Sequence, residues 1–258
     1  MKTVVCRLMT LDPERAKLAL RRSLELNPAN AETIETVTRT PVGRRGGPRR
    51  LTVVTANRWP VWQKRLTVQF LDTNSRALRR RILAHMNAWS PSVNIRFVET
   101  RGTGQVRITR INDGHWSYVG TEILGVDAGQ PTMNLDGFTM ESPEEEYCRV
   151  VRHEAGHTLG FDHEHLREDM VGRIDVKKAI AWYDRTQGWT AAETTAQVLT
   201  PLSKRSVMGT READPLSIMC YQVPAEITTD GVAIPGGLDI SKRDRSYARR
   251  IYPKPVKP

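Results

Sequence analysis

Residues 153–163 read HEAGHTLGFDH, and this stretch decides what the sequence can say about the fold. His153 and His157 are four residues apart, so a helix places both imidazoles on one face, within reach of one cation. Gly160 suits a sharp helix exit because glycine adopts positive φ, and the turn brings His163 back as a third ligand. The pattern H-E-x-x-H-x-x-G-x-x-H therefore predicts a metal site with three histidine ligands.

The ligand set indicates which metal is bound and what it does. Three neutral imidazoles suit Zn²⁺, and three protein ligands leave a fourth position for water, which is the catalytic rather than the structural arrangement. Glu154 points along a different radius of the helix from His153, so it can take a proton from that water without ligating the metal. We expect one zinc ion on His153, His157 and His163, with Glu154 as the general base.

A helix is predicted around this motif, from about Pro143 to Leu159. The acids Glu144–Glu146 suit its positive N-terminal end, and Gly160 ends it. Downstream, residues 214–221 read DPLSIMCY. A methionine in such a turn, following a zinc-binding helix, is a second signature of one group of zinc enzymes.

The two stretches together resemble the metzincin zinc peptidases. The longer run HEAGHTLGFDHEHLRED, residues 153–169, most resembles the astacins, which show H-E-x-x-H-x-x-G-F-x-H-E-H-x-R-x-D. The resemblance implies that Met219 forms an apolar floor below the zinc and that Tyr221 stabilises the oxyanion. It also implies that Glu164 helps to anchor a mature N-terminus, with a plain solvated glutamate as the alternative. Cys220 stands where the family usually has a histidine.

The resemblance also implies an α/β fold, with a twisted, mainly parallel sheet and the zinc helix in an upper subdomain (51–163). A smaller lower subdomain (164–258) holds the Met-turn and a C-terminal helix that starts at Ser241. Alternating patterns at 66–71, 93–99 and 106–111 predict strands, and 75–89 predicts a helix. The short segment 132–135 lies where a metzincin edge strand pairs antiparallel with an extended substrate.

Residues 1–50 form a separate N-terminal segment in this interpretation. Asp12-Pro13-Glu14 predicts a helix start, and the helix runs to Leu26. Residues 41–50, PVGRRGGPRR, are a flexible joint, either a linker or a processing site, and 51–55 is β-like. Whether 1–50 is an inhibitory prosegment stays open at this point.

The remaining cysteines and histidines have weaker patterns. Cys6 is either a plain thiol or a thiolate that blocks the zinc in a latent form. Cys148 and Cys220 are a possible disulfide pair, because one starts the zinc helix and the other lies in the Met-turn. His165 is expected at the surface or beside the ligands rather than on the metal, and His85 and His115 are expected to be structural.

Charge is distributed unevenly along the chain, whose net charge is +10. Residues 1–110 carry 22 Lys and Arg against 7 Asp and Glu, and the remainder carries 17 against 22. Such asymmetry indicates either an anionic partner or simply solvated arginines. No nucleic-acid motif accompanies it, so nucleic acid is an unlikely partner. The sequence does not give the oligomeric state.

The start of the chain meets charges by Asp12 and lacks the apolar core of a secretory signal, although the family is usually secreted. The compartment is therefore undecided between export and retention, and no apolar run approaches the length that spans a bilayer. The function expected is that of a zinc-dependent endopeptidase acting on polypeptides. The alternative is a catalytically weak zinc-bearing protein that binds an anionic partner through its basic N-terminal surface.

Overall fold

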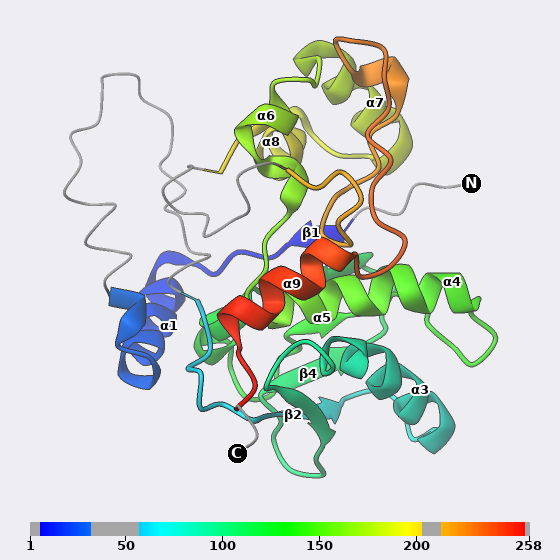
Figure 1. Cartoon of the computed structure of the whole chain (residues 1–258). Helices are drawn as coiled ribbons and strands as arrows, with labels where there is room; N and C mark the ends of the chain where they lie inside the picture. The colour runs from blue at the N-terminus through cyan, green and yellow to red at the C-terminus, as the bar shows by residue number, and fades with distance from the viewer. Residues whose placement is uncertain (1–5, 32–56, 203–212, 256–258) are drawn as a thin grey trace.

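The computed structural model describes residues 6–31, 57–202 and 213–255 (Figure 1). Its sheet has six strands in the order β1-β5-β6-β4-β2-β3. Only β5 and β6 pair antiparallel, and the other neighbours are parallel. The strands are β1 (Cys6–Leu8), β2 (Arg65–Phe70), β3 (Arg96–Glu99), β4 (Val106–Thr109), β5 (His115–Ser117) and β6 (Met133–Asn134).

The helices cover this sheet and build a second lobe. The α-helices are α1 (Pro13–Leu26), α3 (Arg76–Met86), α4 (Glu144–Glu146), α5 (Arg152–Thr158), α6 (Glu168–Val171), α7 (Val176–Gln187), α8 (Ala191–Thr194) and α9 (Lys242–Ile251). Short 3₁₀ turns are η1 (Asn87–Trp89), η2 (Gly120–Gly125), η4 (Glu164–Leu166) and η6 (Ala225–Ile227), and π-helical turns are η3 (Tyr147–Val151) and η5 (Thr195–Leu199). The predicted mainly parallel α/β fold is confirmed.

Local sequence explains most of these elements. In β2 the alternation puts Leu66 and Val68 in the core, fully buried, with their neighbours facing outward. Ser75 caps α3, whose buried face carries Leu78 and Ile82 as its pattern predicts. The strand predicted at 93–99 forms only at Arg96–Glu99.

Two buried clusters underlie the two lobes of Figure 1. The larger lies between the sheet, α3 and α5. The smaller fills the lobe of α6, α7 and α8, with Trp182, Tyr183 and Trp189 at its centre. Strand β1 lies between the two lobes, and its Cys6 is part of the smaller cluster.

The C-terminal helix α9 is anchored on the sheet-side cluster through its end. Tyr252, at its end, is buried in the sheet-side cluster, and its hydroxyl donates to the carbonyl of Leu159 and accepts from the N–H of Trp59. Its own carbonyl accepts from Asn94. The chain therefore returns from the smaller lobe to the larger one, because the apolar face of α9 is covered there.

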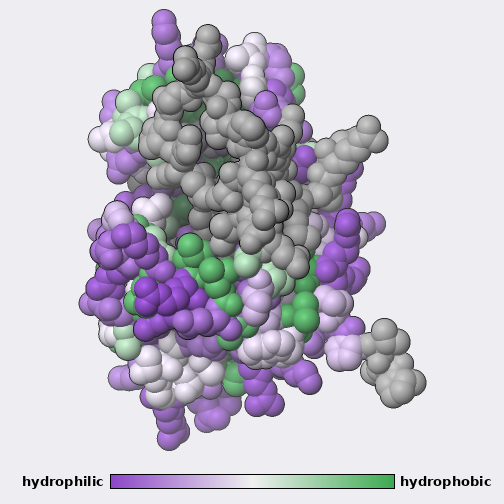
Figure 2. Space-filling view, turned by 90° about the vertical axis from the view of Figure 1, so that its left-hand side faces the viewer, coloured by the Kyte–Doolittle hydropathy of each residue, from purple (hydrophilic) through white to green (hydrophobic). Residues whose placement is uncertain are grey.

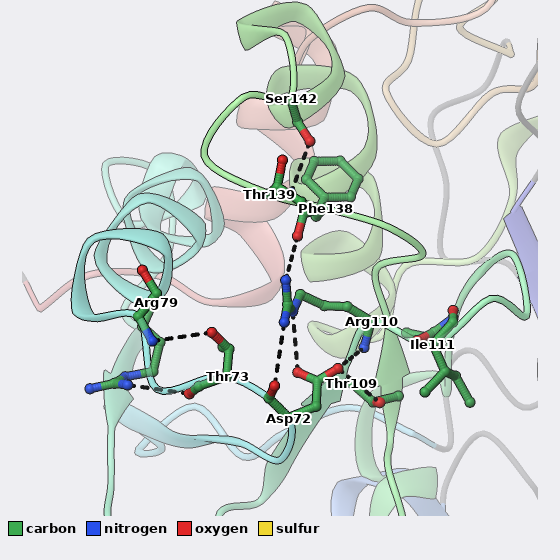
Figure 3. A network of polar contacts seen from close by, with 11 residues as sticks. Asp72, Thr73, Arg79, Thr109, Arg110, Ile111, Phe138, Thr139 and Ser142 are labelled. Atoms are coloured by element: carbon green, nitrogen blue, oxygen red, sulfur yellow. Dashed lines mark hydrogen bonds and ion pairs between the residues drawn. The ribbon is translucent and has the colours of Figure 1, made fainter.

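A polar network fixes the loops at the C-terminal ends of the strands (Figure 3). The Arg110 guanidinium binds Asp72 after β2 and donates to the carbonyl of Phe138, 2.7 Å away, while its backbone N–H donates to Asp72 at 2.6 Å. Next to it, Ser142 accepts from the N–H of Thr139. The loop that leads into the zinc-binding helix is thus held against the sheet by charge-assisted hydrogen bonds.

The segment 132–135 is not an edge strand, which corrects the sequence prediction. Strand β6 pairs with β4 on one side and with β5 on the other. Residues 115–117 form β5 and cover that side. The open side of β5 is in turn occupied by β1. Short strands are hard to predict because pairing, not local propensity, decides them.

Helix α1 forms over the predicted residues, with the Asp12 carboxylate capping its first turn. It packs on η2 through Ala19 and Ser23, which are buried. Figure 2 looks at the molecule from the side on which α1 lies, and much of the described surface there is hydrophilic, in keeping with exposed residues such as Arg21 and Glu25.

Three further predictions concern the joint at 41–50 with the stretch after it, membrane-spanning helices and the domain boundaries. The joint at 41–50 and the β-like stretch 51–55 lie outside the described residues. Among the described helices, none combines the length and apolar character needed to cross a bilayer. The boundaries 1–50, 51–163 and 164–258 stay a prediction.

Replacing Tyr252 with phenylalanine tests the anchoring of α9. The change leaves the buried Trp59 N–H and Leu159 carbonyl each without this partner, so we expect the free energy of unfolding to fall by about 1–3 kcal/mol in urea titrations. The matched control is Tyr247→Phe on the same helix, whose hydroxyl makes no hydrogen bond to the described residues. Equal losses in both variants would contradict the anchoring role.

Candidate metal centre and active site

The zinc-binding motif lies on one continuous helical segment, α4–η3–α5, that starts after Pro143. Its acidic first residues face the partial positive charge of the helix N-terminus. A π-helical turn precedes His153, and such turns are frequent at functional sites. The indole N–H of Trp89 donates to the carbonyl of Arg152 at 2.8 Å, which fixes the helix just before the first ligand.

The structure brings the three predicted ligands together. Nε2 of His153 lies 3.0 Å from Nε2 of His157 and 3.2 Å from that of His163, and the third separation is 3.1 Å. Gly160 ends the helix at φ 94°, in the left-handed region that favours glycine. All three rings are buried, two on α5 and one on the returning loop.

The ring tautomers show that these residues fit a zinc ion. Nδ1 of His153 lies 2.6 Å from the carbonyl of Ile218, and Nδ1 of His157 lies 2.7 Å from that of Phe161. Because a carbonyl only accepts, each Nδ1 carries the proton and each facing Nε2 carries a lone pair. Burial lowers the pKa of all three imidazoles, so the rings are neutral. Converging lone pairs repel one another unless a cation shares them, and Zn²⁺ takes such a ligand set.

Glu154 lies beside this centre on the same helix. Its side chain is fully buried, Oε1 has no hydrogen-bond partner among the described residues, and Oε2 accepts from Sγ of Cys6 at 3.3 Å. Burial is the main cause that raises the pKa of this carboxyl to about 8. The carboxyl is therefore suited to holding a proton as well as releasing one.

Met219 lies under the zinc-binding helix, as the resemblance implies. A Cβ on Gly156 would approach its Sδ to 2.5 Å, so the helix and the Met-turn are in direct contact. Asp244 of α9 holds this turn, because its carboxylate accepts from Ser217 Oγ at 2.6 Å and from the N–H of Ile218 at 2.9 Å. The sequence predicts only the start of this helix at Ser241, and no sequence spacing links Asp244 to the turn.

Tyr221 also reaches the site. Its ring stacks on His165 with centroids 3.9 Å apart and lies 4.4 Å from the His163 ring. Its hydroxyl donates to the backbone carbonyl of Cys6. His165 itself is buried, and its Nε2 lies 3.1 Å from the carbonyl of Gln197, so it orients Tyr221 from beneath rather than lying at the surface.

Glu164 is not a plain solvated glutamate. It is partly buried, and its carboxylate accepts from the N–H of Asp214 at 3.0 Å. Burial raises the pKa of this carboxyl to about 7. Its contact joins the residue after the third ligand to the start of the Met-turn segment.

The three cysteines lie in different surroundings. Cys148 and Cys220 are free thiols, so the disulfide considered between them is wrong. Cys220 is buried in the smaller cluster. Cys6, by contrast, lies at the metal centre: its Sγ and one nitrogen of each of the three ligand histidines are all within 4.8 Å of one another. His85 and His115 lie outside this group.

Comparison with known proteins identifies the family. A family model described as Astacin, a peptidase family, matches residues 54–222, which is more than half of the chain. The chain belongs to the astacin family. This family of zinc metallopeptidases accounts for the three-histidine centre, the Met-turn and the zinc ion that they fit.

Individual astacin-like relatives agree with this assignment. "Structure of myroilysin" is 28% identical with a TM-score of 0.73, and the match covers 79% of this chain and 98% of that one. The medaka (Oryzias latipes) hatching enzyme zinc-protease, high choriolytic enzyme 1, is 19% identical with a TM-score of 0.53 over 74% of this chain and 90% of that one, and supports the fold alone. Zinc metalloproteinase nas-27 of Caenorhabditis elegans is 34% identical over 91 residues, which are 35% of this chain and 19% of that protein. The chain thus matches about a fifth of that relative's length.

Two histidines that are two residues apart provide a matched test of the ligand set in this astacin. We expect His163→Gln to lower zinc affinity by more than about 100-fold. Loss of a residue that only orients a ligand lowers metal affinity by about 10- to 100-fold, and loss of a ligand itself should lower it further. His165→Gln should retain the metal. Competition with a chromophoric chelator measures both, and comparable affinities in the two variants would contradict the assignment.

Proposed function

We propose that this astacin hydrolyses internal peptide bonds of polypeptides, with Glu154 as general base and proton shuttle. The observation that supports this most is that three buried imidazole nitrogens converge beside a buried carboxyl, one oxygen of which has no partner among the described residues. A structural zinc site has four protein ligands and needs no such base. The zinc ion would supply Lewis acidity toward the scissile carbonyl and the attacking water.

The side chains of the chain have distinct roles in this proposal. Glu154 takes the proton from water during attack and delivers it to the leaving amine, because its buried carboxyl lies next to the first histidine and its Oε1 has no partner among the described residues. The Tyr221 hydroxyl, freed from Cys6, donates to the oxygen that becomes negative in the transition state. Since water is the nucleophile, no covalent intermediate forms.

Strand β5 is the element that would hold an extended substrate. The side of β5 that faces away from β6 forms backbone pairs with β1, so its N–H and carbonyl groups are available to a peptide chain when β1 leaves. Backbone pairing of this kind gives affinity without strict sequence preference. It supports a polypeptide as the substrate class.

The arginine-rich N-terminal part offers less support for the anionic-partner alternative. Several of its arginines are paired with acids of the same chain, as in Arg7 with Asp113, Arg79 with Glu99 and Arg110 with Asp72. Such pairs reduce the positive charge that is free to attract a polyanion.

Glu154→Gln tests the general base. The amide keeps the shape of the carboxyl but cannot take a proton, so we expect kcat/KM for an internally quenched peptide to fall about 10²- to 10⁴-fold. The Glu154→Gln variant and its reference protein both carry Cys6→Ala, because Sγ of Cys6 contacts Glu154. Zinc content should be unchanged, and mass analysis of products should show internal cleavage. Undiminished hydrolysis by the glutamine variant would contradict the proposed base.

Tyr221→Phe tests the oxyanion role in the same Cys6→Ala background. Loss of one donor to the developing oxyanion should lower kcat about 10²-fold with little change in KM, because the substrate carbonyl in the ground state gains less from it. Steady-state kinetics on the same peptide separate the two constants. A change in KM alone would assign Tyr221 to substrate binding instead.

A further inference from the structure

The N-terminal strand β1 occupies the active-site cleft. Its residues pair in parallel with β5, with Cys6 opposite His115 and Leu8 opposite Ser117. On its other side, Gln197 of η5 binds Leu8 twice: the Leu8 N–H donates to Oε1 at 3.0 Å, and Nε2 donates to the Leu8 carbonyl at 3.2 Å. Strand β1 is therefore fixed both to the sheet and to the smaller lobe.

Cys6 contacts the proposed catalytic machinery at three points. Its Sγ is within 4.8 Å of the ligand nitrogens and 3.3 Å from Oε2 of Glu154, and its carbonyl accepts from the Tyr221 hydroxyl. The side chain is buried, with 6% of its surface exposed. One residue thus engages the metal site, the base and the oxyanion donor together.

A thiolate is a strong zinc ligand, and three histidines leave one position for it. Oε2 of Glu154 is the acceptor at hand for the thiol proton when the sulfur ligates. The strand also runs parallel to β5, opposite to the antiparallel direction expected of a substrate, and its Cys6 sulfur lies among the ligand nitrogens. These features suit an inhibitor that is not cleaved where it binds.

Helix α1, which packs on η2 outside the cleft, anchors this strand. Ser23 accepts from the Thr121 hydroxyl at 2.8 Å, and the Arg15 carbonyl and Ala19 Cβ lie so close to Gly125 that a Cβ there would meet them at 2.7 and 2.9 Å. An anchored strand has an effective concentration in the millimolar range at the site, so it competes with dilute substrate.

We propose that Cys6 is a fourth ligand of the zinc ion, and that β1 and α1 together form an inhibitory segment that keeps the peptidase latent. The ligand assignment stands on the cluster itself, whereas latency rests on the function proposed above. The segment is released when it is cleaved from the domain or when the thiol leaves the metal.

Cobalt substitution tests the ligand independently of activity. The full chain is loaded with Co²⁺, and a thiolate-to-cobalt charge-transfer absorption is expected in the near ultraviolet for the wild type and for Cys148→Ser. Cys6→Ser should lose this absorption while it keeps the bound cobalt. An identical spectrum in all three proteins would overturn the assignment.

Zinc-loaded full chains test latency. Cys6→Ala should hydrolyse an internally quenched peptide at least about 100-fold faster than the wild type, at equal zinc content, because the tethered ligand is lost. Wild-type hydrolysis as fast as that of the variant would overturn latency. If Cys6→Ala is also inactive while the cobalt absorption depends on Cys6, the ligand assignment stands and the proposed peptidase function fails.

The anchor is tested by two glycines in one region. Gly125→Ala places a methyl group against α1, whereas Gly129→Ala meets nothing within 4 Å. We expect Gly125→Ala to raise both peptide hydrolysis and the alkylation rate of Cys6 by iodoacetamide, measured by peptide mass spectrometry, several-fold over Gly129→Ala. Equal rates in the two variants would show that α1 does not hold the strand in place.

Discussion

Three imidazole nitrogens within 3.2 Å of one another, each buried and neutral, are the constraint on which the rest of the structure depends. Their lone pairs repel without a shared cation, so the surrounding elements must hold the rings in place. The carbonyl of Ile218 in the Met-turn orients one ring, and that of Phe161 in the loop after α5 orients another. Asp244 in turn fixes the Met-turn from α9. The metal centre therefore draws together helix, turn and C-terminal helix.

The same geometry explains why inhibition and catalysis share groups in this astacin. A cleft that admits an extended chain along β5 also admits a strand of the protein itself, and β1 uses it. In this position Cys6 contacts Glu154 and Tyr221, because the roles proposed for these two side chains place both beside the metal centre. An inhibitory strand at this place needs no binding surface of its own. Its attachment comes from α1 and from Gln197, which binds the backbone of Leu8.

Where sequence reasoning went wrong, pairing between distant segments was the cause. Segment 132–135 has the alternation of a strand, but nothing local says that 115–117 folds beside it and takes the edge. The anchoring of α9 is also non-local, because the Tyr252 hydroxyl bonds Leu159 and Trp59. Of the two places expected for His165, at the surface or beside the ligands, the structure shows the second, where the ring is buried and stacks on Tyr221. Each outcome depends on a partner that is many residues away.

The sequence by itself determined the metal-ligand set and the family resemblance, because helical periodicity places His153 and His157 on one face and Gly160 permits the turn to His163. It also determined α1 and α3, whose caps and apolar faces are local. Only the tertiary structure decided where Cys6 lies, and the role proposed for this thiol is based on that position. The thiol lies 148 positions from Glu154 in the chain, and only the parallel pairing of β1 with β5 brings the two side chains to 3.3 Å. A contact of such sequence separation leaves no periodic signal, since it is set by which strands pair and not by local conformation.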